Sequence, residues 1–499
     1  MKKTVIYFLL AVMALSIFPS CTRKNADNSQ LRYGFASEPT TLDPLSSDNT
    51  ADGRSILFNV FEGLVKPGID GTMLPCIASS WTVEQSGLSY NFTIREGVLF
   101  HDGSVVTPAD IKFSLDTAIA SGFPGLDNIS EVTIQGENQI RILLKSIDPE
   151  FLPYLTIGIV KREIADRKKD VIGTGPFFVE SYTKQSNLVL KKFDNYRQDG
   201  LPHLEKVTIV FFSNYDALLV AFRGGSIDGA SITGAMAEQL SHRQFDIFNN
   251  SSSAVQLLAL NNASPPFNDI RVRRAINFAV NIQEIIDAAF FGVGEPSGSP
   301  IIPGLSVYYE NSYSTGESQY NPDMARTLLS QAGFNERNKL IFEITVPSNY
   351  AMHIDTAQVI VDQLEKIDVD ATIKLVDWST WLSEVYFGRQ YQATIISLDS
   401  PTVSPRSFLT RYQSDNVSNF INFNSADFDR IYNAVLTETN NERRIALYKE
   451  AQRVIIANSA SVYIQDILYF TALRQGAYDG VVNYPLYVTD FAAIYGKKE

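Results

Sequence analysis

The chain has 499 residues, of which 45% are hydrophobic and 19% are charged, a composition typical of a globular protein. Domains usually contain roughly 100–200 residues, so this length predicts two or three of them. The net charge of −13 argues against nucleic acid or an anionic membrane surface as the main partner, because binding phosphate groups requires clustered Lys and Arg side chains.

The first thirty residues have the pattern of an export signal followed by a lipid anchor. Two lysines precede an apolar run of eleven residues at 5–15. At about 1.5 Å per residue this run cannot cross a bilayer core of about 30 Å, so residues 1–20 are interpreted as a signal peptide. Cys21 follows a small residue, which predicts its lipidation and a polar tether over 21–30. Ordinary cleavage, with Cys21 incidental, is the alternative.

The remainder of the chain mixes strands and helices. Alternating apolar residues predict strands, and capping residues before apolar repeats of helical spacing predict helices. In chain order, strands are expected at 31–35, 89–95, 98–103, 131–135, 139–145, 187–193, 206–212, 256–261, 339–346 and 371–378. Helices are expected at 54–64, from Thr107-Pro108 onward, and at 216–223, 271–289 and 357–366. This pattern predicts α/β or α+β lobes, with the main hinge near 259–262.

Signatures of catalysis and of metal binding are absent from the sequence. The four histidines, at 101, 203, 242 and 353, do not have metal-ligand spacing, and HExxH is missing. Neither a GxSxG elbow nor a phosphate-binding GxxxxGK[ST] loop occurs. With Cys21 lipidated, Cys76 has no partner and is expected to be a small buried residue. We therefore predict no catalytic residues, no metal site and no cofactor.

Eight segments together resemble one known family. They include SEPTTLDP, FEGLV, DGTMLPCIASSW, IGTGPFFV and YNPDMARTLLSQAGF, and in order they lie at 37–44, 61–65, 70–81, 86–116, 172–179, 260–281, 320–334 and 443–455. In this order they resemble the extracytoplasmic solute-binding proteins of family 5, which contains the dipeptide-, oligopeptide- and nickel-binding receptors of ABC importers. The resemblance extends over essentially the whole chain after Cys21.

The resemblance implies an α/β fold with mixed sheets, built as a two-lobed clamp of the periplasmic-binding-protein type II class. Lobe I would comprise residues 31–258 plus 470–499, with an inserted subdomain at about 48–171. Lobe II would comprise residues 259–469. Ligand would bind between the lobes and be buried when they close.

The same resemblance implies a function. The protein would be a non-enzymatic receptor, a monomer outside the cytoplasm in the periplasm or at the cell surface, and anchored to a membrane by lipid. It would capture a short peptide and deliver it to the permease subunits of an ABC importer. Nucleic acid is not an expected partner.

Three ligand-binding residues are carried over from the family. Asp399 is the acid in the loop that usually pairs with the amino group of a peptide, although it stands about two positions early and no Gly-Trp precedes it. Trp378 matches a tryptophan that borders a side-chain pocket, and Glu38 matches the position where the first strand approaches the ligand.

The displaced Asp399 leaves other functions open. The same receptor could take a non-peptide solute, such as a nickel chelate, an oligosaccharide or an amine compound. The clamp could also serve a non-transport protein that acts as an interaction partner or chaperone. The loops that line the ligand differ between receptors while the scaffold persists, so the sequence leaves these alternatives open.

Overall fold

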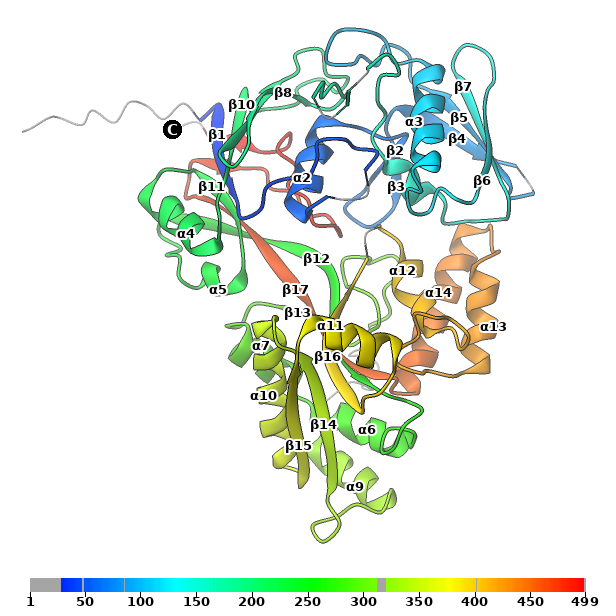
Figure 1. Cartoon of the computed structure of the whole chain (residues 1–499), viewed down its shortest axis with the longest axis vertical. Helices are drawn as coiled ribbons and strands as arrows, with labels where there is room; N and C mark the ends of the chain where they lie inside the picture. Colours follow the sequence, from blue (N-terminus) through cyan, green and yellow to red (C-terminus); the bar gives the residue numbers. More distant parts are fainter. Residues whose placement is uncertain are drawn as a thin grey trace, which may run out of the picture.

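Two lobes are stacked along the long axis of the molecule and share one continuous sheet (Figure 1). The computed structural model describes residues 28–497, apart from 47–48, 85, 165, 168, 312–319 and 401. The strand order along the shared sheet is β15-β14-β16-β12-β17-β11-β1-β10-β9-β8. The predicted mixed α/β class is confirmed, whereas the predicted signal peptide and Cys21 lie outside the described residues.

The first lobe is built on three parallel strands. β1 (Gln30–Phe35) lies between β10 (Lys206–Phe211) and β11 (Gly229–Ile232) and is parallel to both. β9 (Asn187–Lys192) and β8 (Phe177–Thr183) extend this sheet as antiparallel strands. Alternate residues of β1 and β10, among them Tyr33 and Ile209, are fully buried in the core. The helices α2 (Ala51–Val60) and α4 (Tyr215–Gly224) also belong to this lobe.

A separate four-stranded sheet extends the first lobe to one side (Figure 1). Its strands follow the order β4 (Ala78–Val83), β5 (Ser89–Ile94), β7 (Gln139–Leu144) and β6 (Ile129–Ile134). Helix α3 (Pro108–Ala120) accompanies the sheet and buries Ile111 and Leu115. The helix begins where the sequence predicts, since Thr107 caps it in a capping box with Asp110 and Pro108 occupies its first turn.

The second lobe contains another set of parallel strands. β14 (Leu340–Pro347) is parallel to both β15 (Val369–Val376) and β16 (Ala393–Asp399). Helices accompany this sheet: α6 (Ile270–Ala279), α7 (Ile282–Ala289), α9 (Pro322–Gln331), α10 (Ala351–Glu365), α11 (Trp378–Thr380), α12 (Pro405–Leu409), α13 (Ala426–Val435) and α14 (Asn441–Ala457). Within the described part of the chain, no helix has both the length and the apolar character needed to span a bilayer.

Two long strands connect the lobes. β12 (Phe245–Leu260) and β17 (Ser461–Arg474) run antiparallel through the centre of the shared sheet. The end of β17 pairs with β11 in the first lobe, while β12 from Ala254 onward pairs with β16 in the second. Between Ser251 and Val255 the register shifts, and Ser253 takes a positive φ of 61°. The strands are therefore irregular where they pass from one lobe to the other.

Three predicted elements differ from the structure. The helix expected over 271–289 is two helices, α6 and α7, because Val280 is extended and Asn281 caps the second one. The helix expected at 54–64 begins at Ala51, after the Thr50 cap, and ends at Val60. Gly63 lies beyond the end of this helix, and a side chain there would clash, since an added Cβ would meet the carbonyl oxygen of Leu155.

The strand expected at 98–103 is a turn with one isolated bridge, from Leu99 to Val105. Val98 and Phe100 are both buried, which produces the alternating pattern without a partner strand.

Several of the sequence motifs meet at one buried ion pair. The Glu62 carboxylate lies 2.7 Å from Arg197 Nη2, and both side chains are less than a tenth exposed. It also accepts hydrogen bonds from Tyr196 at 2.9 Å, Thr174 at 3.2 Å and Cys76 Sγ at 3.4 Å. Burial raises the pKa of the Cys76 thiol to about 12, so this cysteine is an inert part of the cluster. These segments, which carry the family resemblance, therefore serve the fold of the first lobe.

His101 is another packing residue. Its Nδ1 accepts a hydrogen bond from the Gly173 amide at 3.1 Å, and Nε2 lies 3.0 Å from the Gly175 carbonyl oxygen. These contacts fit the neutral ring with its proton on Nε2, because a second proton on Nδ1 would face an N–H donor. Burial lowers the pKa of His101 to about 4.

This environment predicts a loss of stability in mild acid. The unfolded His101 takes up a proton near pH 6.5 and the folded one near pH 4, so the unfolded state binds more protons in that window. The free energy of unfolding should therefore fall as the pH is lowered from about 6.5 to 4, by about 3 kcal/mol for this residue. Urea unfolding at pH 7.0, 5.5 and 4.5 measures this loss.

The variant His101→Gln should have a shallower pH dependence than the native protein. His242→Gln is the matched control, because His242 is exposed. If the stability of His101→Gln depends on pH as steeply as that of the native protein, the loss of stability in acid does not come from His101.

Candidate functional site

Each lobe presents the carboxyl ends of three parallel strands at one edge. In the second lobe the chain leaves β14, β15 and β16 at this edge, and in the first lobe it leaves β1, β10 and β11. Figure 1 shows both edges turned toward the middle of the molecule, where the paired strands β12 and β17 pass from one lobe to the other. Ligands of open α/β sheets bind outside the carboxyl ends of the strands. The candidate site therefore lies between the two lobes.

Aromatic side chains line the edge of the second lobe. Tyr350 lies three residues after β14, and Trp378 lies two residues after β15. Their ring centroids are 5.6 Å apart in an edge-to-face arrangement. Trp378 stacks on Trp381 at 5.1 Å with an interplanar angle of 5°, and Tyr386 packs against Trp381 at 6.0 Å. We call these four residues the aromatic row.

Hydrogen bonds from the neighbouring strand and loop hold the aromatic row in position. Trp381 is 2% exposed, and its Nε1 donates to Thr394 Oγ1 on β16 at 2.9 Å. The Asp377 carboxylate caps α11 by accepting from the Thr380 amide at 3.0 Å. Residues Trp381–Phe387 form a π-helix, a rare conformation that occurs often at functional sites. Trp378 is left 38% exposed on this support, so a flat aromatic face is available to a ligand.

Asp399 lies at the same edge. It is the last residue of β16, pairs with Ala254 of β12 and is exposed. Among the residues that the structure describes, none forms a hydrogen bond or an ion pair with its carboxylate. The structure thus places two of the sequence-predicted residues, Trp378 and Asp399, at one edge of one sheet.

Glu38 lies at the facing edge of the first lobe, three residues after β1. Its Oε1 accepts hydrogen bonds from Tyr182 at 2.7 Å and from the Gln185 amide at 2.9 Å, both in the β8–β9 hairpin. The carboxylate is therefore used within the first lobe. The bonds to the hairpin both use Oε1, and the Glu38 carbonyl oxygen accepts from the Thr50 hydroxyl at 3.2 Å.

A buried polar network lies behind the aromatic row. Gln465 of β17 donates to Gln256 of β12 at 2.8 Å, and Gln256 donates to both His353 Nδ1 and Thr356 at 3.0 Å. His353 follows Tyr350 by one helical turn, with the two rings 5.4 Å apart. Burial lowers the pKa of His353 to about 4, so the ring is neutral near pH 7. The network joins the central strands to the helix that carries Tyr350.

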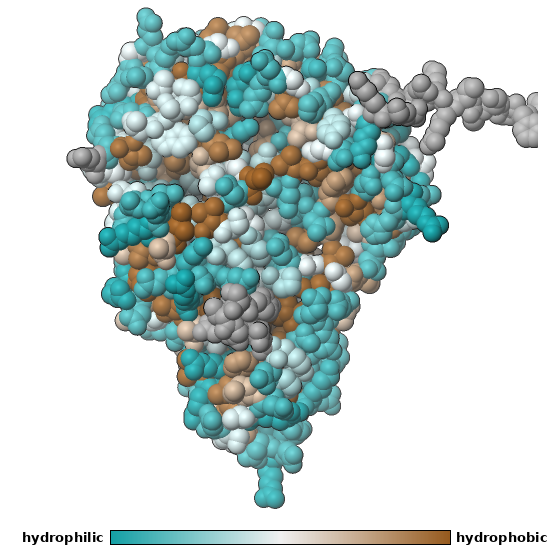
Figure 2. Space-filling model, turned by 180° about the vertical axis from the view of Figure 1, so that it is seen from behind, coloured by the Kyte–Doolittle hydropathy of each residue, from teal (hydrophilic) through white to brown (hydrophobic). Residues whose placement is uncertain are grey.

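The lobes also touch each other directly. Arg406 Nη1 lies 2.7 Å from Asp148 Oδ1, and Ser404 donates to the buried Glu150. A pocket of about 490 Å³ lies beside this contact, lined by residues of both lobes that include Trp81, Tyr90, Tyr308 and Arg444. Seen from behind, apolar side chains form a broken band across the middle of the molecule (Figure 2).

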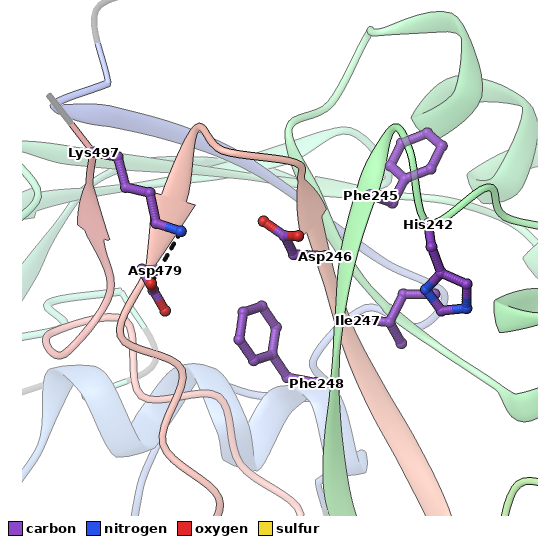
Figure 3. Close-up of a pocket in the computed structure, with 7 residues that line it drawn as sticks. All are labelled: His242, Phe245, Asp246, Ile247, Phe248, Asp479 and Lys497. Carbon is purple, nitrogen blue, oxygen red and sulfur yellow. Dashed lines mark ion pairs between the residues drawn. The ribbon is translucent and has the colours of Figure 1, made fainter. Parts of the chain in front are cut away.

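A second pocket, of about 440 Å³, lies on the first lobe near its C-terminal strands (Figure 3). Its charged groups already have partners: Lys497 pairs with Asp479 at 3.0 Å, and Asp246 accepts from the Gly476 amide at 3.0 Å. None of the predicted site residues lines it. Over the described ranges of the chain, no cluster of side chains suited to a metal ion is present.

Sequence reasoning missed Tyr350 and Tyr386 of the aromatic row. Tyr350 follows β14 as Trp378 follows β15, so the rule used for strand ends could have found it. Tyr386 lies in the π-helix Trp381–Phe387, and no local pattern in the sequence marks that conformation.

Comparisons with known proteins agree with this architecture. The family model of the bacterial extracellular solute-binding proteins, family 5 Middle, matches residues 72–420. The heme-binding protein A of Haemophilus influenzae is 26% identical over 88% of this chain and 87% of its own length. The glutathione-binding protein GsiB of Salmonella typhimurium is 26% identical over 89% of each chain.

Among solved structures, the periplasmic murein tripeptide binding protein MppA, in its unliganded open form, has the same fold. It superposes with a TM-score of 0.85 at 20% identity, covering 95% of this chain and 98% of its own. This agreement confirms the predicted two-lobed fold. Because the family model covers well over half of the sequence, the chain belongs to the family 5 bacterial extracellular solute-binding proteins and is a solute receptor rather than an enzyme.

Proposed function

We propose that this receptor captures a short peptide between its two lobes and delivers it to the permease subunits of an ABC importer. The observation that carries the proposal is the edge of the second lobe, where the Asp399 carboxylate has no hydrogen bond or ion pair with any described residue and stands at the same strand ends as Tyr350 and Trp378. An aromatic face suits peptide side chains, since it supplies apolar contact area without much loss of conformational freedom.

The charge requirement supports a peptide. An ammonium group enclosed between closed lobes needs a carboxylate partner, because leaving it unpaired costs several kcal/mol. Asp399 supplies that carboxylate, and Glu38 stands at the facing edge of the first lobe. One solved structure that this chain resembles is named for a murein tripeptide, and one relative is named for glutathione.

The proposal includes the lobe boundaries. The division into 31–258 plus 470–499 and 259–469 places the pivot on the two central strands, and the irregular stretch at Ser251–Val255 is a suitable place for bending. The lobes would close over the ligand, and the protein would act as a monomer.

Ligand binding should stabilise the folded protein by about 2.7 kcal/mol at a hundredfold excess of ligand over Kd. A thermal-shift screen of di- to pentapeptides, oligosaccharides and nickel chelates measures this effect, and small-angle scattering measures closure. A shift confined to sugars or to nickel chelates would replace the peptide with that ligand class. No shift with any class, together with unchanged scattering, would favour a non-transport interaction or chaperone protein.

We also propose that Cys21 carries a lipid that anchors the mature protein outside the cytoplasm. The full-length protein should then fractionate with membranes, and Cys21→Ser should move it to the soluble fraction. Cys76→Ser is the matched control, because Cys76 is buried in the first lobe. Equal distribution of the native protein and Cys21→Ser between the two fractions would refute the anchor.

A further inference from the structure

The two lobes meet at a polar contact beside the central strands. Arg406 Nη1, on α12 of the second lobe, lies 2.7 Å from Oδ1 of Asp148, which follows β7 in the first lobe. The hydroxyl of Ser404, the residue that caps α12, donates to the Glu150 carboxylate. We call these four residues the α12 contact. Figure 1 shows α12 to the right of β12 and β17, on the side of the molecule that carries the four-stranded sheet.

Short turns hold both sides of the α12 contact. In the first lobe, Asp148 Oδ1 accepts from the Glu150 amide at 3.0 Å, and the Asp148 carbonyl oxygen accepts from the Tyr90 hydroxyl at 2.7 Å. In the second lobe, the Ser404 side chain accepts from the Arg406 amide at 3.1 Å. The groups that meet are therefore presented by turns that are themselves hydrogen-bonded.

Separating the lobes at this point would be costly. Asp148 and Glu150 are each less than a tenth exposed. If the α12 contact opened, both carboxylates would stay in the first lobe and lose the groups that pair with them. Breaking a buried ion pair by taking away one partner is strongly destabilising, because it leaves a buried charge uncompensated. A closing movement that keeps the contact formed avoids this cost.

The second lobe is also attached to the irregular stretch of the central strands. The Ser400 amide, directly after β16, donates to the Ser253 carbonyl oxygen at 3.0 Å. Ser253 has the positive φ within the register shift of β12, and its hydroxyl donates to the Pro485 carbonyl oxygen of the first lobe at 3.2 Å. Four residues after Ser400, Ser404 makes the contact with Glu150. Two fixed points define a line, and a rigid lobe attached at both can turn only about that line.

We propose that the α12 contact is a pivot for closure, which stays formed in the ligand-free and in the ligand-bound protein. The second lobe turns about a line through this contact and the stretch Ser251–Val255. Asp148 and Arg406 are then positioning residues, because they restrict the path on which the second lobe approaches the first. This inference rests on the proposed closure of the lobes and adds its axis.

A pivot and a latch have opposite effects on affinity. A latch would hold only the open protein together, so removing it would favour the closed protein and tighten ligand binding. A pivot restricts the movements of the ligand-free protein, so that less freedom is lost when the ligand closes the lobes. Removing a pivot therefore weakens ligand binding.

The double variant Asp148→Asn with Arg406→Met tests the sign of this effect. Both charges leave together, so neither buried partner remains unpaired. Isothermal titration uses the peptide that gives the largest shift in the thermal-shift screen. The double variant should bind this peptide about threefold to tenfold more weakly than the native protein does. Asp427→Asn with Arg430→Met is the matched control, since this ion pair is exposed on α13, and it should bind as the native protein does.

A chemical cross-link tests directly whether the contact opens. Val83 on β4 and Thr439, between α13 and α14, line the pocket of about 490 Å³ beside the α12 contact, one from each lobe. In a Cys21→Ser background, a short bismaleimide can join Val83→Cys to Thr439→Cys, because Cys76 is buried. The linked protein should bind the same peptide within about threefold of the unlinked protein, because closure about a pivot leaves the lobes together at this point.

The outcomes separate the pivot from the receptor function. Tighter or unchanged binding by the double variant, or loss of binding in the linked protein, would overturn the pivot. The receptor function would stand in each case if small-angle scattering still shows that the peptide closes the native protein. If no solute of the screen closes the native protein, the proposed closure fails and the pivot fails with it.

Discussion

Replacing Glu62 by Ala should lower the free energy of unfolding by about 3–5 kcal/mol. The Glu62 carboxylate is 7% exposed, accepts from Arg197 Nη2 at 2.7 Å and also receives the Tyr196 and Thr174 hydroxyls. Removing it leaves the buried guanidinium without its anion and two hydroxyl groups without an acceptor, and each unpaired group adds to the cost. Urea unfolding at pH 7 measures the loss.

A double variant distinguishes the cost of an unpaired charge from a general packing defect. Glu62→Leu combined with Arg197→Met removes both charges and keeps apolar volume, so the double variant should be more stable than Glu62→Ala. Glu180→Ala is a suitable control, because its ion pair with Lys191 is exposed and should contribute at most about 1 kcal/mol. If Glu62→Ala unfolds at the same urea concentration as the native protein, the ion pair does not hold the first lobe together.

The Glu62 cluster shows why the sequence predicts the fold of this chain well. FEGLV contributes Glu62, DGTMLPCIASSW contributes Cys76, and IGTGPFFV contributes Thr174, so three separate motifs meet at a single ion pair. Their residue types are fixed by contacts that define the fold, and a family resemblance built on them identifies the scaffold. The same motifs contain little information about the ligand.

Local patterns failed where packing between distant segments decides the structure. The alternation at 98–103 resembles a strand, yet His101 binds the backbone of Gly173 and Gly175 and turns the chain there. The apolar repeat over 271–289 is continuous, but Asn281 caps a second helix and its amide donates to Gln363 on α10. Neither contact can be inferred from neighbours in the sequence.

The sequence predicts those residues of the candidate site that stand at or just after the end of a strand. Trp378 and Asp399 stand where β15 and β16 end, and that rule also places Tyr350 after β14. Glu38 occupies the predicted edge, but the β8–β9 hairpin takes up its carboxylate. Tyr386 depends on the π-helix Trp381–Phe387, which no short-range pattern specifies. The sequence thus predicts which residues stand at the strand ends, whereas the partners of their side chains become known only from the folded chain.

Asp399→Asn should weaken peptide binding by at least a hundredfold. Truncating one member of a buried charge pair typically costs about 3–5 kcal/mol, which corresponds to two to four decades in Kd. In the empty protein the Asp399 side chain is exposed and has no partner among the described residues, so the free energy of unfolding without ligand should remain nearly unchanged. Isothermal titration with a peptide found in the thermal-shift screen measures the affinity.

Two controls make this expectation specific to the amino group of the ligand. Asp415→Asn removes the same charge from another exposed position of the second lobe and should bind the peptide as the native protein does. The N-acetylated form of the peptide should bind poorly to the native protein and lose little further affinity in Asp399→Asn, because the acetyl group has already removed the ammonium charge. If Asp399→Asn binds the free peptide with native affinity, Asp399 does not receive an ammonium group, and the ligand is recognised by something other than its amino terminus.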